Sequence, residues 1–331
     1  MSNTVRDRPI RQVNLEPLPS EPGEPRRLLV PLKASGSRAP LFVVPGQFGE
    51  AFQFTRLAGR LRDDIPFYSF EAKGLWGGVE SHQTIQETAA DFIAEMRAVQ
   101  PHGPYFVGGF SLGGATAWEM LRRLNEAGET VHLILFDMGP EIWLTAEEIE
   151  QQPGPTFWMR VTHPGRVAAF HARNAFGLTG ARRKAYVRSV FRQEVGRIGM
   201  LIGLGEDNFL VRFSLKAGRT PPPGHMAVRS GLEEMRERWE WEPCSQRFTL
   251  LRAQIQDPGT RLTETLGFTP EIARGGIDVR HVPGHHGFIF SEPHVFWVIA
   301  EIEGWIDRIE AEGATRATPL EATDDAGIGS S

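Results

Sequence analysis

Cysteine is almost absent from this chain. Cys244 is the single cysteine among 331 residues, so an intrachain disulfide is excluded, and we expect a reducing, cytoplasmic compartment. The residues around Cys244 supply no electropositive group that would activate a thiol. We therefore interpret Cys244 as a small core residue rather than a nucleophile.

Long apolar runs are missing as well. No stretch approaches the roughly 18 apolar residues that a membrane-spanning helix needs. Residues 1–27 are polar and rich in proline, without the apolar core of a signal peptide. Metal-ligand spacing is also absent, because the adjacent His285 and His286 would point apart on an extended loop. The sequence therefore predicts neither membrane insertion nor a metal site.

Neither sign of charge dominates. The chain has 36 Lys and Arg against 41 Asp and Glu, a formal net charge of −5, which argues against nucleic acid as the main partner. With 40% hydrophobic and 23% charged residues, the composition is that of a soluble globular protein.

What the chain does contain is an alternation of strand-like and helix-like segments. Short apolar runs bounded by proline and glycine predict strands, and apolar stripes at helical spacing predict helices. This alternation is typical of an α/β fold with a mostly parallel sheet and helices on both faces. The expected strands are 28–33, 41–44, 66–72, 105–110, 131–136, 248–253 and 277–282, and the expected helices are 52–62, 85–99, 112–127 and 293–312.

Three segments depart from the alternation. Residues 1–27 and 313–331 are rich in Pro, Gly, Ser, Thr and acidic residues, and we expect them to be a disordered arm and tail around a domain of residues 28–312. Residues from about 141 to 242 contain helical segments but no clear strand. An insertion of this size over the carboxyl ends of the strands predicts a lid.

The most informative motif is Gly-x-Ser-x-Gly, which spans residues 109–113 with Ser111 at its centre. An apolar strand precedes the motif and a helix follows it, which is the context of a nucleophile elbow. A side chain at Gly109 or Gly113 would collide with the neighbouring backbone in so tight a turn. The pattern predicts that Ser111 is an exposed nucleophile.

A serine nucleophile needs a base and a carboxylate that orients the base. His286 follows an expected strand and precedes the last helix, and Asp137 ends the strand that follows the serine helix. The order Ser, Asp, His is the one expected on an α/β-hydrolase sheet. Two alternatives stay open from position alone: His285 could replace His286, and Asp257 could replace Asp137.

An oxyanion formed at Ser111 also needs two backbone N–H donors. Leu112 starts the serine helix, where free N–H groups and the helix dipole favour negative charge. The second donor is expected from the loop after the strand 41–44, and we choose Gln47.

These segments resemble the thioesterase domains that release chains from nonribosomal peptide and polyketide synthases. The resemblance spans about residues 28–310 and is carried by Pro40–Gly46, Gln100–Tyr105, Gly108–Gly114, Trp118–Met120, Leu133–Asp137, Val282–His286 and Glu292–His294. It implies an α/β-hydrolase fold with a helical lid, and it favours Asp137 over Asp257. The chain departs from the family at His285, where an acidic residue is common, and at the bulky pair Gln47-Phe48.

The resemblance implies a serine thioesterase. It would take an acyl or peptidyl chain from a carrier protein through an acyl-Ser111 ester, and would release it by hydrolysis or cyclisation. No cofactor is implied, because the substrate arrives on the phosphopantetheine arm of the carrier. The alternatives are a small-molecule carboxylesterase without a carrier, and a non-catalytic binding protein with a hydrolase fold. An intact Ser–Asp–His set argues against the second alternative.

A basic segment in the expected lid suggests where a carrier docks. Residues 160–197 carry nine basic side chains and the single acid Glu194, about +8 in a chain of net −5. Carrier proteins in the resembled family's systems are usually acidic, so we expect this segment to attract one. The alternative is an ordinary solvated helical face.

Overall fold

The computed structural model describes Val5, residues 8–19, 26–140, 222–255 and 263–317, and scattered residues between 165 and 188. Seven strands form one sheet in the order β1-β3-β2-β4-β5-β6-β7. Strand β1 runs antiparallel to β3, and the other neighbours are parallel. The strands are β1 (Leu29–Lys33), β2 (Leu41–Val44), β3 (Phe67–Phe70), β4 (Tyr105–Phe110), β5 (Val131–Phe136), β6 (Phe248–Ile255) and β7 (Ile277–His285). The predicted α/β class with a mostly parallel sheet is confirmed.

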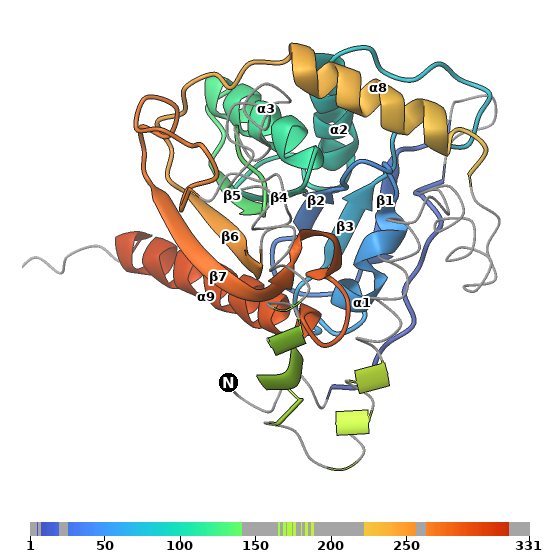
Figure 1. The fold of residues 1–331 in the computed structure, drawn as a ribbon. Coiled ribbons are helices and arrows are strands. Elements are labelled where there is room, and N and C mark those ends of the chain that lie inside the picture. The colour runs from blue at the N-terminus through green and yellow to red at the C-terminus, as the bar shows by residue number, and fades with distance from the viewer. Residues whose placement is uncertain are drawn as a thin grey trace, which may run out of the picture.

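Helices cover both faces of this sheet. Figure 1 shows α2 (Ile85–Val99), α3 (Gly113–Glu126) and α8 (His225–Arg238) on one side, with α1 (Thr55–Ala58) and α9 (Val295–Ala317) on the other. Helix α2 packs against α3, and α1 packs against α9. Two short 3₁₀ helices, η1 (Ala51–Phe54) and η2 (His286–Phe288), complete the described elements.

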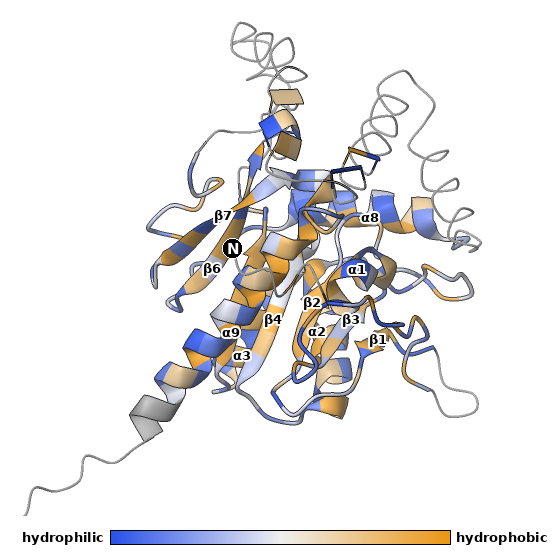
Figure 2. Cartoon of the chain, turned by 90° about the horizontal axis from the view of Figure 1, so that it is seen from below, coloured by the Kyte–Doolittle hydropathy of each residue, from blue (hydrophilic) through white to orange (hydrophobic). Residues whose placement is uncertain are grey.

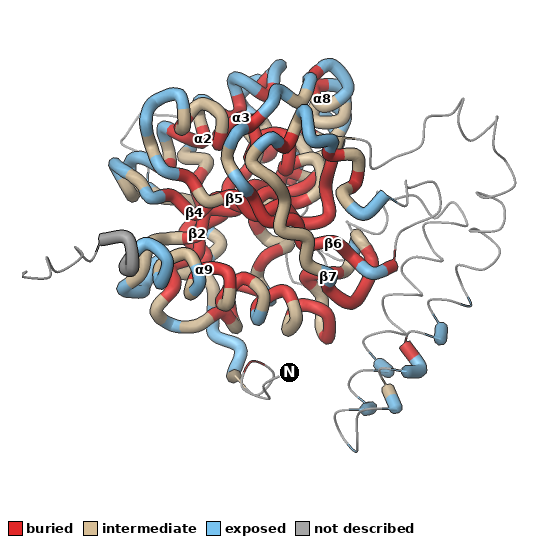
Figure 3. Tube along the Cα trace, turned by 90° about the vertical axis from the view of Figure 1, so that its left-hand side faces the viewer, coloured by how far each residue is buried: buried red, intermediate tan, exposed pale blue. Residues whose placement is uncertain are grey.

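The period-two pattern of the strands explains why there are two cores. In β2, Phe42 and Val44 pack with the α2 and α3 side, whereas Leu41 and Val43 pack with the α1 and α9 side. Successive strand side chains point to opposite faces, so a strand that is apolar throughout needs a helix layer on each side. The hydrophobic strands accordingly lie between the helices (Figure 2), and the backbone of the central strands is buried (Figure 3).

Helix α2 begins where the sequence predicts. Thr84 and Glu87 form a capping box: the Glu87 N–H donates to Thr84 Oγ1 at 3.1 Å, and the Thr84 N–H donates to Glu87 Oε2 at 3.3 Å. Two N–H groups that have no partner inside the helix are thereby satisfied. Cys244 is buried in the core on the α2 and α3 side of the sheet. Burial raises the pKa of its thiol, as expected for a core cysteine.

Within the arm of residues 1–27 that we expect to be disordered, residues 8–19 lie along the edge of the sheet. The N–H groups of Asn14 and Leu18 donate to β1 carbonyls at 3.1 and 2.9 Å. Strand β1 is the edge of the sheet, and this segment satisfies groups that an edge leaves unpaired. At the other end of the domain, α9 continues to Ala317, into the first residues of the expected tail.

Only part of the expected lid, 141–242, lies within the described residues. Helix α8 is its best-described element, and it is hydrogen-bonded to the segments that follow β3 and β5. The Gly224 N–H donates to the Leu75 carbonyl at 2.9 Å, and the Arg236 guanidinium donates to the Pro140 carbonyl at 2.8 Å. Within the described parts of the chain, no helix is long and apolar enough to cross a bilayer.

Candidate active site

Ser111 lies on a strained turn between β4 and α3. Its backbone φ is 51°, a left-handed conformation that is uncommon for residues other than glycine. A Cβ added at Gly109 would approach the Gly114 Cα to 2.7 Å, and one at Gly113 would approach the Pro45 carbonyl oxygen to 2.1 Å. The two glycines of the motif therefore allow the close contacts that hold this turn.

Strand register brings Asp137 to the same edge of the sheet as Ser111. Phe110 pairs with Phe136 between β4 and β5, so Ser111 and Asp137 each follow immediately after paired residues. The Ser111 N–H donates to the Phe136 carbonyl at 3.3 Å. The carboxyl ends of neighbouring parallel strands thus gather the two side chains, as the rule for such sheets predicts.

His286 joins the two residues. Its Nε2 lies 2.9 Å from Ser111 Oγ, and its Nδ1 lies 3.0 Å from Asp137 Oδ2. The imidazole is largely covered, with a side-chain exposure of 13%, and Asp137 is fully buried. Both distances are those of ordinary hydrogen bonds. A proton can therefore pass from the serine hydroxyl to the imidazole, whose orientation the carboxylate holds.

Asp137 is held by backbone groups of β6. Its own N–H donates to the Leu251 carbonyl at 2.8 Å, and its Oδ1 accepts the Ala253 N–H, also at 2.8 Å. Its φ of 52° is another left-handed value, which aspartate tolerates better than most residues. One carboxylate oxygen is thus held by Ala253, and the other faces His286.

The structure decides between the two candidate histidines but does not place both candidate acids. His285 ends β7 with its side chain buried, and its ring packs edge-on against Phe288 at 4.5 Å between centroids. His286, and not His285, lies within hydrogen-bonding distance of Ser111. Asp257 lies outside the described residues, so its placement is not compared with that of Asp137.

The expected oxyanion donors lie on the two loops that meet at Ser111. Leu112 immediately precedes α3, and within the described residues no acceptor is recorded for its backbone N–H or for that of Gln47. A Cβ added at Gly46, the residue before Gln47, would approach the Ser111 Cβ to 3.1 Å. The loop after β2 therefore passes close to the serine, and the donor roles of Gln47 and Leu112 stay predictions.

Helix α8 covers the loop that carries Gln47 and Phe48. A Cβ added at Gly49 would meet Val228 Cγ1 at 3.0 Å, and the Arg229 guanidinium lies 5.9 Å from the Phe48 ring centroid. The bulky Phe48, which departs from the resembled family, thus contacts a helix of the expected lid.

The sequence analysis did not predict two features near the site. The first is the Ala253 N–H on Asp137, which depends on strand order. The second is the Phe110 ring, which stacks on the His286 imidazole with 5.1 Å between centroids and 24° between planes. The position of Phe110 next to Ser111 in the motif is the one sequence feature that could have suggested it.

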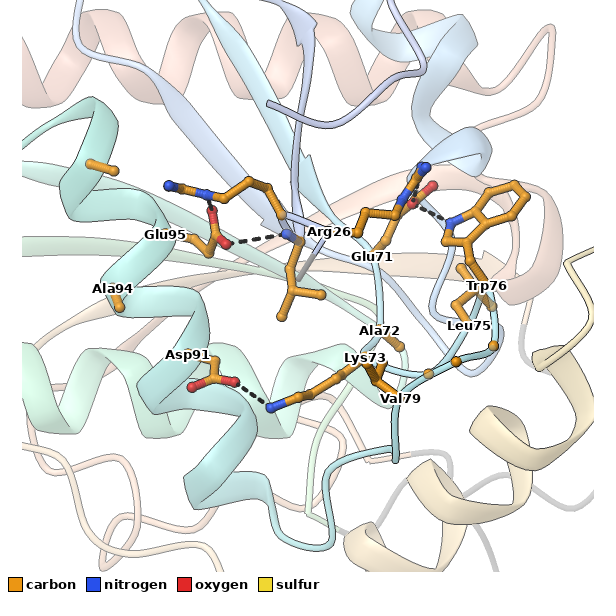
Figure 4. A pocket seen from close by; sticks show the side chains of 16 residues that line it. Arg26, Glu71, Ala72, Lys73, Leu75, Trp76, Val79, Asp91, Ala94 and Glu95 are labelled. Atoms are coloured by element: carbon orange, nitrogen blue, oxygen red, sulfur yellow. Dashed lines mark hydrogen bonds and ion pairs between the residues drawn. The ribbon is translucent and has the colours of Figure 1, made fainter. Parts of the chain in front are cut away.

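A cavity of about 610 Å³ lies elsewhere, between α2 and the segment after β3 (Figure 4). None of the three residues of the Ser111–His286–Asp137 chain lines it. Its charged side chains pair with one another: Arg26 with Glu71, Arg27 with Glu95, and Lys73 with Asp91. Of the residues that the structure describes, no serine, threonine or cysteine lines the cavity. The two arginine pairs attach residues 26 and 27 to the loop after β3 and to α2, and the Lys73–Asp91 pair joins that loop to α2. Within the described residues, no cluster of side chains is suited to hold a metal ion.

Residues 39–171 match the family model described as Thioesterase domain. This range contains Ser111 and Asp137. Ala253 and His286 lie outside it, on β6 and at the start of η2.

Related proteins contain this domain as a small part of a large chain. The chain is 40% identical over 107 residues to malpinin synthetase of Mortierella alpina, 32% of this chain and 1% of that one. It is 34% identical over 127 residues to an atromentin synthetase of Serpula lacrymans, 38% of this chain and 13% of that one. A dimodular nonribosomal peptide synthase of Bacillus subtilis is 36% identical over 122 residues, 37% of this chain and 5% of that one. The chain therefore matches only a small fraction of the length of these relatives.

Solved structures agree on the fold. A four-domain nonribosomal peptide synthetase bound to AMP and glycine aligns with a TM-score of 0.57 at 20% identity, covering 85% of this chain and 20% of that chain. The NocB thioesterase domain in covalent complex with a fluorophosphonate nocardicin G analogue aligns with a TM-score of 0.53 at 19% identity, covering 83% and 98%. At these identities the alignments establish the α/β-hydrolase fold of thioesterase domains.

Proposed function

We propose that this protein is a serine thioesterase that releases an acyl or peptidyl chain from a carrier-protein thioester. The observation that carries the proposal is the pair of hydrogen bonds that link Ser111, His286 and Asp137, in a protein whose residues 39–171 match the family model described as Thioesterase domain. The relatives named above are synthetases, which supports a role in the synthesis of secondary metabolites.

In the first half of the reaction, the chain passes from sulfur to Ser111. Ser111 Oγ forms a bond to the thioester carbonyl carbon while His286 Nε2 takes the hydroxyl proton. The carbon–sulfur bond then breaks, and the imidazolium returns that proton to the departing thiol. Asp137 stabilises the imidazolium through Nδ1 and stays ionised. The N–H groups of Gln47 and Leu112 would hold the oxyanion, and loss of one such donor typically costs about 100-fold or more in rate.

In the second half, the acyl-Ser111 ester is broken. His286 takes a proton from water, or from a hydroxyl or amine of the bound chain, and the nucleophile attacks the ester carbon. The ester bond to Oγ breaks and Ser111 regains its proton. Water yields a free acid, whereas an internal hydroxyl or amine yields a ring. A covering lid that excludes water would favour the ring.

A paired-substrate assay tests this proposal. The purified protein is given an acyl pantetheine thioester and the matching oxygen ester, and thiol or alcohol release is measured with Ser111→Ala as the control. We expect faster turnover of the thioester and none in the variant. Turnover of the ester alone would identify a carboxylesterase. Absence of both activities, together with no labelling by a fluorophosphonate, would identify a non-catalytic binding protein.

The partner of this site would be an acidic carrier protein that docks on the basic segment 160–197. Four of the nine basic residues are described, and all four are exposed: Arg173, Arg183, Lys184 and Arg188. The other five lie outside the described residues. Phe176, in the same segment, is 80% exposed. The Arg183 guanidinium donates to the carbonyl of Ala175, the residue before Phe176, at 3.1 Å. An exposed aromatic ring with basic neighbours suits an acidic surface that offers an apolar contact.

Charge reversal tests the docking surface. Arg183→Glu with Arg188→Glu should lower turnover of a carrier-bound substrate and leave turnover of a soluble pantetheine thioester unchanged. In the wild type, the carrier reaction should also slow as salt is added, because screening shortens the reach of surface charge. The matched control is Arg274→Glu with Arg308→Glu, which changes the net charge equally at two other exposed positions. Equal losses on both substrates, or none, would refute docking at this segment.

A further inference from the structure

The residue before the serine lies against the face of the proposed base. Phe110 ends β4 and is 9% exposed. Its ring is nearly parallel to the His286 imidazole, at 24° and 5.1 Å between centroids. Its position is set by the edge of Phe290 at 4.9 Å, and a Cβ added at Gly46 would approach Phe110 Cδ1 to 3.1 Å. Phe110 is therefore packed firmly where it covers one face of the imidazole.

Hydrogen bonds and a ring contact together restrain the imidazole. Both of its nitrogens lie in hydrogen bonds, one to Ser111 and one to Asp137. The imidazole can rotate about its Cβ–Cγ bond, and this rotation moves both nitrogens out of line with their partners. The two hydrogen bonds oppose the rotation, and contact of the Phe110 ring with the imidazole face resists it further.

We propose that Phe110 is a positioning residue for His286: it fixes the imidazole plane and stabilises the imidazolium that forms as Ser111 loses its proton. The proposal rests on the proposed role of His286 as the base. A cation within about 6 Å of an aromatic centroid is attracted to the ring face, more so where water is excluded. The face of the Phe110 ring carries the negative side of the aromatic quadrupole, so it favours the charged imidazole over the neutral one without supplying a competing hydrogen bond.

The effect of Phe110 on His286 has to be distinguished from that of the other titratable groups near the imidazole. Asp137 follows β5 and is hydrogen-bonded to the imidazole, His285 ends β7 and packs on Phe288, and His294 lies just before α9. A Cβ added at Gly284 would approach the His294 ring to 2.9 Å. Burial, and to a lesser degree the neighbouring His171, lowers the pKa of His294 to about 3. His294 is therefore neutral wherever the enzyme would be assayed.

The test compares Phe110→Leu, which keeps an apolar side chain but removes the ring, with Phe110→Tyr, which keeps the ring face. The rate of Ser111 phosphonylation by a fluorophosphonate is measured across pH, along with kcat and KM on a soluble thioester. For Phe110→Leu we expect a loss of about 3- to 30-fold in labelling rate and kcat, with KM little changed. The acid limb should move down by about 0.5 to 1.5 pH units, because the imidazolium loses stabilisation. Phe110→Tyr should behave like the wild type.

Phe92→Leu is the matched control, because Phe92 is also buried and stacks on Phe70 at 4.3 Å in the core on the opposite face of the sheet. It should lower thermal stability without moving the acid limb. The proposal is overturned if Phe110→Leu keeps the wild-type rate and limb, or if both leucine variants lose rate with no shift of the limb. Labelling reports on His286 whatever the substrate. A protein that is labelled at Ser111 but does not cleave thioesters would contradict the proposed function and leave this inference intact.

Discussion

Replacing Asp137 with asparagine should leave the protein folded and nearly inactive. Asparagine tolerates the left-handed backbone of this residue, and its side chain has nearly the shape of aspartate. Its amide orientation is set by β6, because the Ala253 N–H needs the oxygen that Asp137 Oδ1 now supplies at 2.8 Å. The amide NH₂ would then face His286 Nδ1 and require that nitrogen to be an acceptor. The proton would move to Nε2, which could no longer accept the proton of Ser111.

The same change in serine proteases lowers kcat about 10⁴-fold, or about 5.4 kcal/mol at 1.36 kcal/mol per tenfold, and we expect a loss of that order. The assay is thiol release from a soluble acyl pantetheine thioester, with circular dichroism and thermal unfolding to confirm the fold. Asp257→Asn serves as the control and should retain activity. An Asp137→Asn variant within tenfold of the wild type would refute the reasoning, and a dead Asp257→Asn variant would assign the acid to Asp257.

His286→Ala should lose activity by about 10⁴-fold or more, while His285→Ala should retain it, since only the His286 ring reaches Ser111; the reverse result would move the base to His285. Gly113→Ala should destabilise the fold by about 1–3 kcal/mol or more in urea unfolding, because its Cβ would meet the Pro45 carbonyl oxygen at 2.1 Å. Gly231→Ala in α8 meets nothing within 4 Å and should be neutral or stabilising by up to about 1 kcal/mol. Thr84→Ala removes the capping box of α2 and should cost about 0.5–2 kcal/mol of stability with unchanged kcat; a loss of kcat would connect α2 to the site.

The sequence predicts best those features that depend on residues close together in the chain. Strands β2 and β5 and helix α2 have the predicted bounds, because apolar runs and caps lie next to the residues they affect. The nucleophile turn is equally local: the glycines at 109 and 113 are needed by contacts that form within a few residues or with one neighbouring loop.

Long-range contacts limit the rest. The choice between His285 and His286 depends on the direction in which β7 ends, and the partner of Asp137 Oδ1 depends on β6 lying beside β5. The segment 8–19 has a composition typical of disorder, but its backbone pairs with an edge strand that composition does not reveal. Phe110 and His286 are 176 positions apart in the chain, so the sequence alone could not indicate that their rings stack.

The central claim is that Ser111 carries the acyl chain during turnover. The most direct measurement mixes the protein with an acyl pantetheine thioester, quenches the reaction in acid within milliseconds, and maps the acyl mass by peptide mass spectrometry. We expect the acyl mass on the peptide that contains Ser111, formed before free acid or ring product appears and absent from Ser111→Ala. Thioester turnover with no acyl mass on Ser111, or with the acyl mass on another residue, would contradict it.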